Sequence, residues 1–297
     1  MSRTAVACIL ATLVVSAQAI ADEPFWNQRP LRYWLNQLQV GDASAQEQAA
    51  RGVMAMAAEH GSASVAAAVP LLVPCLDAPD APLRAAAADA LGPIGAVAEP
   101  AGPRLLKLFE SDPDATVRRS AGMAVAQIKP GTSDFVVTAG NVLARDTDAA
   151  VRQTAAALLV EVGAAARPIL PLAHAALSDS DPMVRVYAAA IVGHLGETAI
   201  AVPVLLDGLQ SRDGAVRAEA TGLIVETAPL DKRVLPALLE GLRDEDRRVR
   251  IAAADALGVI GPPAIAAADP LWRMIHDPDE EVRDHALKAL RLIKEQE

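Results

Sequence analysis

The sequence is poor in cysteine, in aromatic residues and in positive charge. It contains 2 Cys, 3 Trp, 2 Tyr and 3 Phe among 297 residues, and its formal net charge is −10. Nucleic-acid affinity rests mainly on Lys and Arg that neutralise phosphates, so the acidic balance argues against a nucleic-acid partner. The scarcity of aromatics, beside a hydrophobic fraction of 52% that is mostly Ala, Leu and Val, favours closely packed helices over a large central core.

Motifs of the common catalytic and metal sites are absent as well. The histidines show no regular metal-ligand spacing, and none is followed by Glu; they are His60, His174, His194, His276 and His285. There is no Gly-rich phosphate loop, no Gly-x-Ser-x-Gly turn and no Cys-x-x-Cys pair. Cys75 stands among apolar residues, which predicts a buried packing residue rather than a nucleophile. The sequence therefore predicts no catalytic residue, no metal site and no cofactor.

Residues 1–21 have the features of a cleavable secretory signal. Arg3 precedes an uncharged run with a short apolar part, and small residues follow at Ala17, Ala19 and Ala21. Cleavage would remove Cys8 and leave Cys75 without a cysteine partner for an internal disulfide.

The alternative is an uncleaved membrane anchor. Ser16 and Gln18 interrupt the run, which falls short of the ~20 apolar residues that span a bilayer. We therefore expect the mature chain to begin near Ile20 or Asp22 and to carry no integral membrane segment. We also expect it to lie outside the cytoplasm, as a periplasmic or secreted protein.

A hydrophobic residue followed by Arg recurs along the rest of the chain at steps of 34, 34, 33, 32, 33 and 33 residues. The arginines are Arg84, Arg118, Arg152, Arg185, Arg217, Arg250 and Arg283. A further step of 33 residues back from Arg84 reaches Arg51 in a degenerate segment. About eight repeats therefore fill the mature chain, and their regularity predicts a repeat architecture.

An aspartate stands four residues before each of the seven arginines, and we expect it to cap a helix at its N-terminus. These aspartates are Asp80, Asp114, Asp148, Asp181, Asp213, Asp246 and Asp279. An Ala three residues after each Arg and an aliphatic residue seven after it continue an apolar stripe of helical period. Gly then ends several of these runs, as at Gly95, Gly196 and Gly261. A second apolar stretch upstream of each Asp completes a helix–turn–helix repeat.

The recurring Asp and Arg suggest a structural ladder along the turns. Arg in the first turn of a helix faces the positive end of the helix dipole, so its recurrence calls for a compensating partner. We expect the Asp four residues earlier to pair with it, and the ladder to link neighbouring repeats. The functional alternative is a row of arginines that binds anions.

The repeated Asp-x-x-Val-Arg-x-x-Ala-Ala-x-Ala-Leu-x-x-Ile-Gly pattern resembles the HEAT-like repeats of phycobilisome lyases. Residues 246–261 and 279–293 fit it best, and the resemblance covers nearly all of the chain after the signal. It implies an all-α fold, a right-handed α-α solenoid of about eight HEAT-like repeats. Its implication for function is weaker, because such arrays serve many partners.

We expect one solenoid over residues 22–297, with capping repeats at 22–61 and 263–297 and central repeats at 62–262. Polar residues close the last helix: Lys288, Arg291 and Lys294. Four of the eight aromatics, Phe25, Trp26, Tyr33 and Trp34, lie near the start. They either cap the first repeat or form a binding site for a peptide or sugar. Pro130-Gly131 predicts a turn that could kink the stack.

The expected function is a non-catalytic interaction scaffold or adaptor that binds a basic or polar protein or peptide on its concave helical face. The predicted contact residues are Glu161, Tyr187, His194, Glu219 and Glu226, which lie two or nine residues after a repeat Arg. A merely solvated face is the alternative at these positions. The competing function is an enzyme or maturation factor related to bilin-chromophore lyases or HEAT-repeat hydroxylases.

Overall fold

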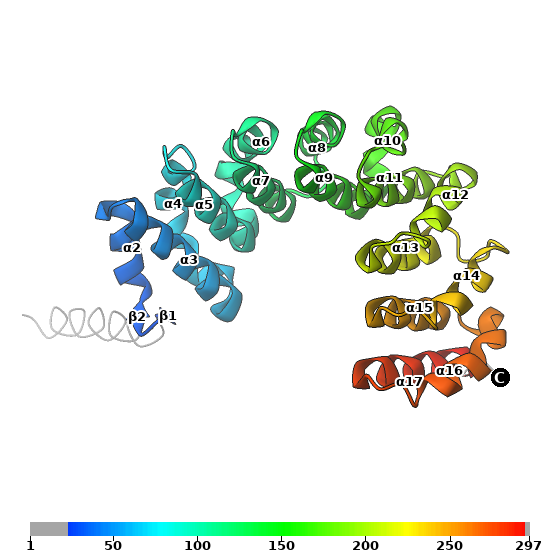
Figure 1. Ribbon diagram of the computed structural model, residues 1–297. Coiled ribbons are helices and arrows are strands. Elements are labelled where there is room, and N and C mark those ends of the chain that lie inside the picture. Colours follow the sequence, from blue (N-terminus) through cyan, green and yellow to red (C-terminus); the bar gives the residue numbers. More distant parts are fainter. Residues whose placement is uncertain (1–22, 295–297) are drawn as a thin grey trace, which may run out of the picture. The chain divides into compact units, whose positions relative to one another are not determined.

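The computed structural model describes residues 23–294, which are helical apart from one short hairpin and the turns (Figure 1). The elements are β1 (Phe25–Trp26), β2 (Arg29–Pro30), α2 (Leu31–Val40), α3 (Ala43–His60), η1 (Ser62–Ala68), α4 (Val69–Cys75), α5 (Ala81–Ile94), η2 (Gly95–Ala101), α6 (Gly102–Ser111), α7 (Ala115–Ile128), α8 (Ser133–Arg145), α9 (Ala149–Val162), η3 (Gly163–Ile169), α10 (Leu170–Ala176), α11 (Pro182–His194), α12 (Thr198–Gly208), α13 (Gly214–Thr227), α14 (Val234–Gly241), α15 (Arg247–Ile260), η4 (Pro262–Ala267), α16 (Ala268–Met274) and α17 (Glu280–Lys294). The η elements are 3-10 helices. The expected signal peptide lies outside the described residues.

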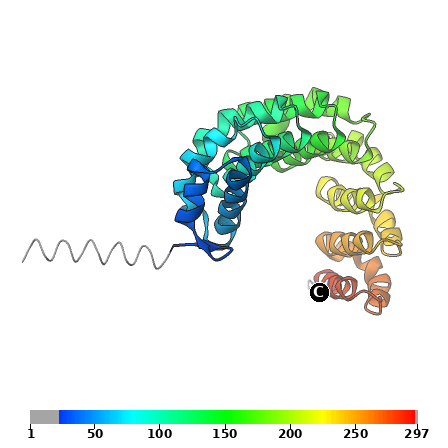
Figure 2. The ribbon, with the colours of Figure 1, turned by 60° about the vertical axis from the view of Figure 1, so that its left-hand side comes forward.

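The chain divides into two compact units. The N-terminal unit ends at Phe135, and the C-terminal unit begins at Val136. The division falls shortly after Pro130-Gly131, and each unit is described by itself. In the N-terminal unit, α3, α5 and α7 pack in succession. In the C-terminal unit, α9, α11, α13, α15 and α17 do the same. Figures 1 and 2 show α13, α15 and α17 in successive layers of that unit.

The second helix of each repeat begins where the sequence predicts. Six of the seven aspartates accept hydrogen bonds from first-turn N–H groups; they are Asp114, Asp148, Asp181, Asp213, Asp246 and Asp279. Asp80 is the exception, because it holds the N-cap position of α5 without a side-chain cap bond. Gly95 and Gly261 follow α5 and α15 with φ of 67° and 69°, a backbone region that favours glycine.

Alanine makes the close packing of these helices possible. The Ala three residues after each repeat Arg is fully buried, with 0% exposure in every case: Ala87, Ala121, Ala155, Ala188, Ala220, Ala253 and Ala286. Interiors are packed to crystal density, so a longer side chain at these positions would push the helices apart.

The Asp–Arg ladder differs from the expectation. Four repeat arginines pair with an aspartate 27 or 28 residues later rather than with the one four residues earlier: Arg84 with Asp112, Arg152 with Asp179, Arg217 with Asp244, and Arg250 with Asp277. Each of these aspartates stands two residues before the N-cap Asp of the following repeat. The pairing predicted within one repeat is therefore wrong.

The physical reason lies in the geometry of the first helical turn. Side chains on a helix lean toward its N-terminus, which carries the arginine past its own cap into the turn before it. The cap carboxylate is already occupied by main-chain N–H groups, as at Asp181 with Met183 and Val184. The turn of the next repeat supplies a carboxylate whose two oxygens both accept from the guanidinium, as Asp179 does from Arg152.

The N-terminal aromatic residues pack on the first helices. The hairpin turns at Asn27 and Gln28, both with positive φ, and places the Trp26 ring 4.8 Å from that of Trp34. Trp34 is 5% exposed. Trp26 also lies over Gly52 of α3, so the cluster covers that helix.

One stretch of the described residues, Ala149–Ala176, is long and apolar enough to cross a membrane by length and composition. It consists of α9, η3 and α10, and Gly163 has a φ of 61° between α9 and η3. Apolar side chains of α9, such as Val151 and Leu159, are fully buried in the C-terminal unit.

Candidate functional site

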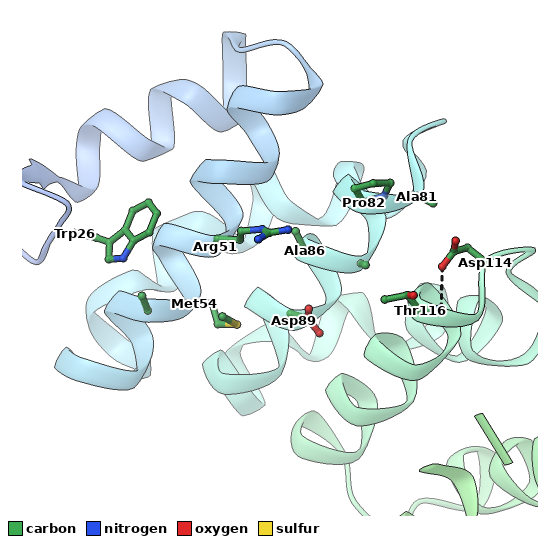
Figure 3. Close-up of a pocket in the computed structure, with 11 residues that line it drawn as sticks. Trp26, Arg51, Met54, Ala81, Pro82, Ala86, Asp89, Asp114 and Thr116 are labelled. Carbon is green, nitrogen blue, oxygen red and sulfur yellow. Dashed lines mark hydrogen bonds between the residues drawn. The ribbon is translucent and has the colours of Figure 1, made fainter. Parts of the chain in front are cut away.

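A groove runs across the second helices α3, α5 and α7 of the N-terminal unit (Figure 3). Its volume is about 540 Å³, and it is lined by Trp26, Arg51, Met54, Ala55, Ala81, Pro82, Ala85, Ala86, Asp89, Asp114 and Thr116. Binding sites for ligands commonly have volumes of this order, with mostly apolar walls and a few polar groups. The groove has that composition.

The floor and walls of the groove follow from the sequence of α5. Ala85 and Ala86 are buried beside the repeat Arg, and their short side chains leave room above the helix. Trp26 lies at one end of the groove, while Asp114 and Thr116 lie at the other (Figure 3). Met54 is 36% exposed and adds a flexible apolar wall from α3.

The charged groups in the groove differ in how they are satisfied. Arg51 is exposed and pairs with Glu47 at 2.6 Å. Asp114 caps α7, because its Oδ1 accepts from the N–H of Thr116 at 2.8 Å and from the N–H of Val117 at 3.2 Å. Asp89 is half-buried and has no hydrogen bond or ion pair among residues 23–294. Asp255, at the same position of the Arg250 repeat, pairs instead with His285 at 2.7 Å.

An unpaired, partly desolvated carboxylate favours a cationic group beside it. Asp89 therefore marks the place in the groove where a positive charge would be stabilised. The alanines, Met54 and Trp26 that also line the groove offer apolar surface to an aliphatic stem.

The structure brings together only part of the predicted contact patch. Tyr187 on α11 is half-buried, and this burial raises the pKa of its phenol. The charge of Glu219 on α13, its hydrogen bond with the phenol and the charge of Glu161 on α9 raise the pKa further. His194 and Glu226 form no hydrogen bond or ion pair with these residues in the described chain.

The sequence alone does not bring Trp26, Arg51, Met54 and Asp89 together. Two sequence signals pointed near them: the aromatic cluster with its alternative role in binding, and Arg51 as the degenerate repeat Arg. Trp26, Arg51 and Asp89 line one groove because α3 and α5 pack side by side.

Cys75 and the possible metal ligands form no further site among residues 23–294. Cys75 is buried, its thiol donates to the Leu71 carbonyl at 3.3 Å, and burial raises its pKa. Across residues 23–294, no three His, Cys, Asp or Glu side chains come together in a group that could hold a metal ion.

Comparison with known proteins places the fold. A family model described as HEAT repeats matches residues 32–126, 138–225 and 202–291. One chain in the structure of the complex of CpcE and CpcF of phycocyanin lyase from Nostoc sp. PCC7120 is structurally similar. It has 19% identity and a TM-score of 0.56, and the match covers 92% of this chain and 98% of that chain. YibA of Escherichia coli gives 20% identity and a TM-score of 0.47 over 74% and 91% of the two chains. No curated protein sequence matches.

Proposed function

Because the chain belongs to the HEAT-repeat family, as its recurring motif predicts, we propose that it is a non-catalytic interaction scaffold or adaptor. We further propose that its groove across α3, α5 and α7 holds a segment of a partner protein. Repeat arrays of this kind commonly offer extended surfaces on which partners are held by distributed contacts.

The observation that carries the proposal is the unpaired Asp89 in an alanine-floored groove beside Trp26. A Lys or Arg side chain satisfies both features, since its stem packs on apolar surface while its head group reaches the carboxylate. The formal net charge of −10 favours the approach of such a segment. The proposed occupant is therefore a partner segment with a basic residue next to an apolar one.

A second contact surface is proposed for the same basic partner in the C-terminal unit. Glu161 and Glu219 place two negative charges near the Tyr187 phenol. It comprises Glu161, Tyr187 and Glu219, the predicted contact residues whose side chains interact. It can be tested separately from the groove.

Selection from a displayed peptide library tests the groove. Peptides retained by the mature chain should carry Lys or Arg beside an apolar residue. Asp89→Lys should weaken their binding at least about tenfold, because it places a like charge at the contact. Glu110→Lys makes the same charge change at an exposed position on α6 and should bind as the parent does.

The double variant Glu161→Lys and Glu219→Lys, which reverses both charges near Tyr187, separates the two surfaces. Loss of binding in this variant alone would move the partner site to the C-terminal unit. Equal capture of the same peptides by the parent, Asp89→Lys and the double variant would contradict both surfaces. Circular dichroism of each variant checks that the helices persist.

The enzyme or maturation-factor alternative makes a different prediction. A chromophore lyase or hydroxylase relative, isolated from its own source, would carry pigment absorbance or stoichiometric metal. Measuring both on the natively purified protein distinguishes it from the scaffold.

The proposed location is outside the cytoplasm, periplasmic or secreted. It is supported by the signal-like residues 1–21. N-terminal sequencing should find a mature start near Ile20 or Asp22, and a full-length cytoplasmic product would contradict it.

A further inference from the structure

All seven repeat arginines share one anchor. Nη1 of each donates to the main-chain oxygen six residues earlier, at 2.8 to 2.9 Å. In the four ladder pairs, the remaining edge of the guanidinium, Nε and Nη2, binds both oxygens of an aspartate. These eight bonds measure 2.7 to 3.1 Å. The anchor therefore aims the free edge at the following repeat.

Arg185 has the anchor but not the carboxylate. Its Nη1 donates to the Asp179 carbonyl at 2.9 Å, whereas its Nε and Nη2 have no partner anywhere in residues 23–294. Each paired arginine binds an Asp that stands two residues before the cap of the following repeat. For Arg185 the following cap is Asp213, and the residue two before it is Ser211. Ser211 Oγ accepts from the N–H of Asp213 at 3.2 Å and leaves the guanidinium edge unpaired.

The place of the missing carboxylate is hollow. A cavity of about 160 Å³ lies between α11 and α12, lined by Pro182, Arg185, Val186, Val204, Asp207, Gly208, Gln210 and Ser211. That volume is roughly five times the share of one water molecule in the liquid, so a carboxylate and its carbon stem fit. Val186 and Val204 supply apolar wall for the stem.

Asp207 is the opposing charge in this cavity. It is exposed, and no ion pair joins it to Arg185. Its charge disfavours a doubly charged anion more than a singly charged one, so a carboxylate suits the cavity better than phosphate.

We propose that this cavity is a carboxylate-binding site, in which Arg185 donates from Nε and Nη2 to both oxygens of a ligand carboxylate. The ligand takes the place that an aspartate fills beside the four paired arginines. It is either an Asp or Glu side chain of a bound protein or a small free carboxylate, and the fork geometry is the same for both. The site is independent of the groove and does not rest on the proposed function.

Arginine Nε–H signals in nitrogen-15 NMR spectra of the mature chain test this directly. Acetate and a blocked Gly-Asp-Gly peptide should each shift the Arg185 signal saturably, while the paired Arg152, Arg217 and Arg250 serve as internal controls. A lower midpoint for the peptide assigns the site to a protein side chain, whereas similar midpoints assign it to a free carboxylate. Phosphate should bind more weakly, and chloride at equal ionic strength should give no saturable shift.

Ser211→Asp provides the decisive variant. It restores the ladder aspartate, so the internal carboxylate should fill the site and reduce acetate binding at least about tenfold. Arg185→Gln should abolish the ligand-induced shifts of the Gln210 and Ser211 amides, which gives a second readout. An Arg185 signal that no carboxylate moves, or amide shifts equal in the parent and both variants, would overturn the proposal.

Discussion

Arg84 and Asp112 are 28 residues apart in sequence and form two parallel hydrogen bonds of 2.8 Å between consecutive repeats. Their side chains are 10% and 2% exposed. Burial strengthens their attraction, but it also makes either charge costly without the other. Asp112 also accepts from the N–H of Asp114 at 2.9 Å, which ties the pair to the cap of α7.

Asp112→Ala should therefore destabilise the protein strongly. It leaves the Arg84 guanidinium uncompensated in a nearly dry site, a loss of about 3–5 kcal/mol in the free energy of unfolding. Asp77→Ala is the control, because Asp77 pairs with Arg104 at side-chain exposures of 63% and 49%, and such pairs contribute about 0–1 kcal/mol. Urea denaturation measures both. Similar losses in the two variants would mean that burial does not govern the ladder.

The helix caps allow a second, smaller comparison. Asp181 caps α11 through Met183 at 2.9 Å and Val184 at 3.0 Å, whereas Asp80 caps α5 without a side-chain bond. Asp181→Ala should therefore lower the free energy of unfolding by about 1 kcal/mol, and Asp80→Ala by clearly less. Asp181 also accepts from Gln153 at 3.0 Å, so Gln153→Ala measures that separate contribution. Equal losses at Asp80 and Asp181 would contradict the role of the cap bonds.

Much of the fold could be predicted because the same residues recur at the same positions of each repeat, and each of them favours one local structure. Asp at the cap, Ala at the helix contact and Gly at the end each act within a few residues of the chain. The all-α repeat fold and the resemblance to phycobilisome-lyase HEAT-like repeats are both confirmed by the family match and the structural likeness.

The pairing of the ladder and the groove could not be predicted in the same way. Arg84 meets Asp112 because consecutive repeats stack, and a local rule about residues three or four apart on a helix led to the wrong partner. The groove is lined by both Trp26 of the hairpin and Asp89 of α5, and no periodicity relates these two positions. Ser211 lies two residues before Asp213, outside the Asp-x-x-Val-Arg motif, so the motif does not reveal its place in the ladder.

The buried ladder carboxylates also predict a dependence of stability on pH. Burial alone would raise the pKa of Asp179, but hydrogen bonds from Arg152 and from the Asp181 N–H leave it below its ordinary value. Burial would likewise raise the pKa of Asp244, but hydrogen bonds from Arg217 and from the Asp246 N–H lower it below its ordinary value. A carboxylate with a depressed pKa stabilises the fold above its unfolded pKa of about 3.9, and this stabilisation is lost as pH falls through the folded value.

The free energy of unfolding should thus fall steadily from about pH 5 to about pH 2. Asp179→Asn removes one of the titrating groups, so its urea-unfolding curves should change less over that range. Glu110→Gln controls for the loss of one acidic side chain at an exposed position. A slope for Asp179→Asn that matches the parent would contradict the linkage.

Two glycines inside helices test how the hairpin is held. A Cβ on Gly52 of α3 would lie 2.6 Å from Trp26 Cε3 and 3.1 Å from Cζ3, so the rigid indole would have to move. A Cβ on Gly222 of α13 meets no heavy atom within 4 Å. Alanine stabilises a helix interior by about 1 kcal/mol relative to glycine, so Gly222→Ala should raise the free energy of unfolding.

Gly52→Ala should lower the free energy of unfolding despite the same helical gain, because displacing Trp26 disrupts its packing on α3 and Trp34. Trp272→Phe leaves Trp26 of the hairpin and Trp34 of α2 as the remaining tryptophans of the sequence, so fluorescence then reports this aromatic pair alone. In that background Gly52→Ala should shift the emission toward longer wavelengths, while Gly222→Ala should not. Since Trp26 also forms one end of the groove, peptide binding should weaken in the same variant. An unshifted spectrum with normal stability would mean that the indole does not depend on the bare glycine surface.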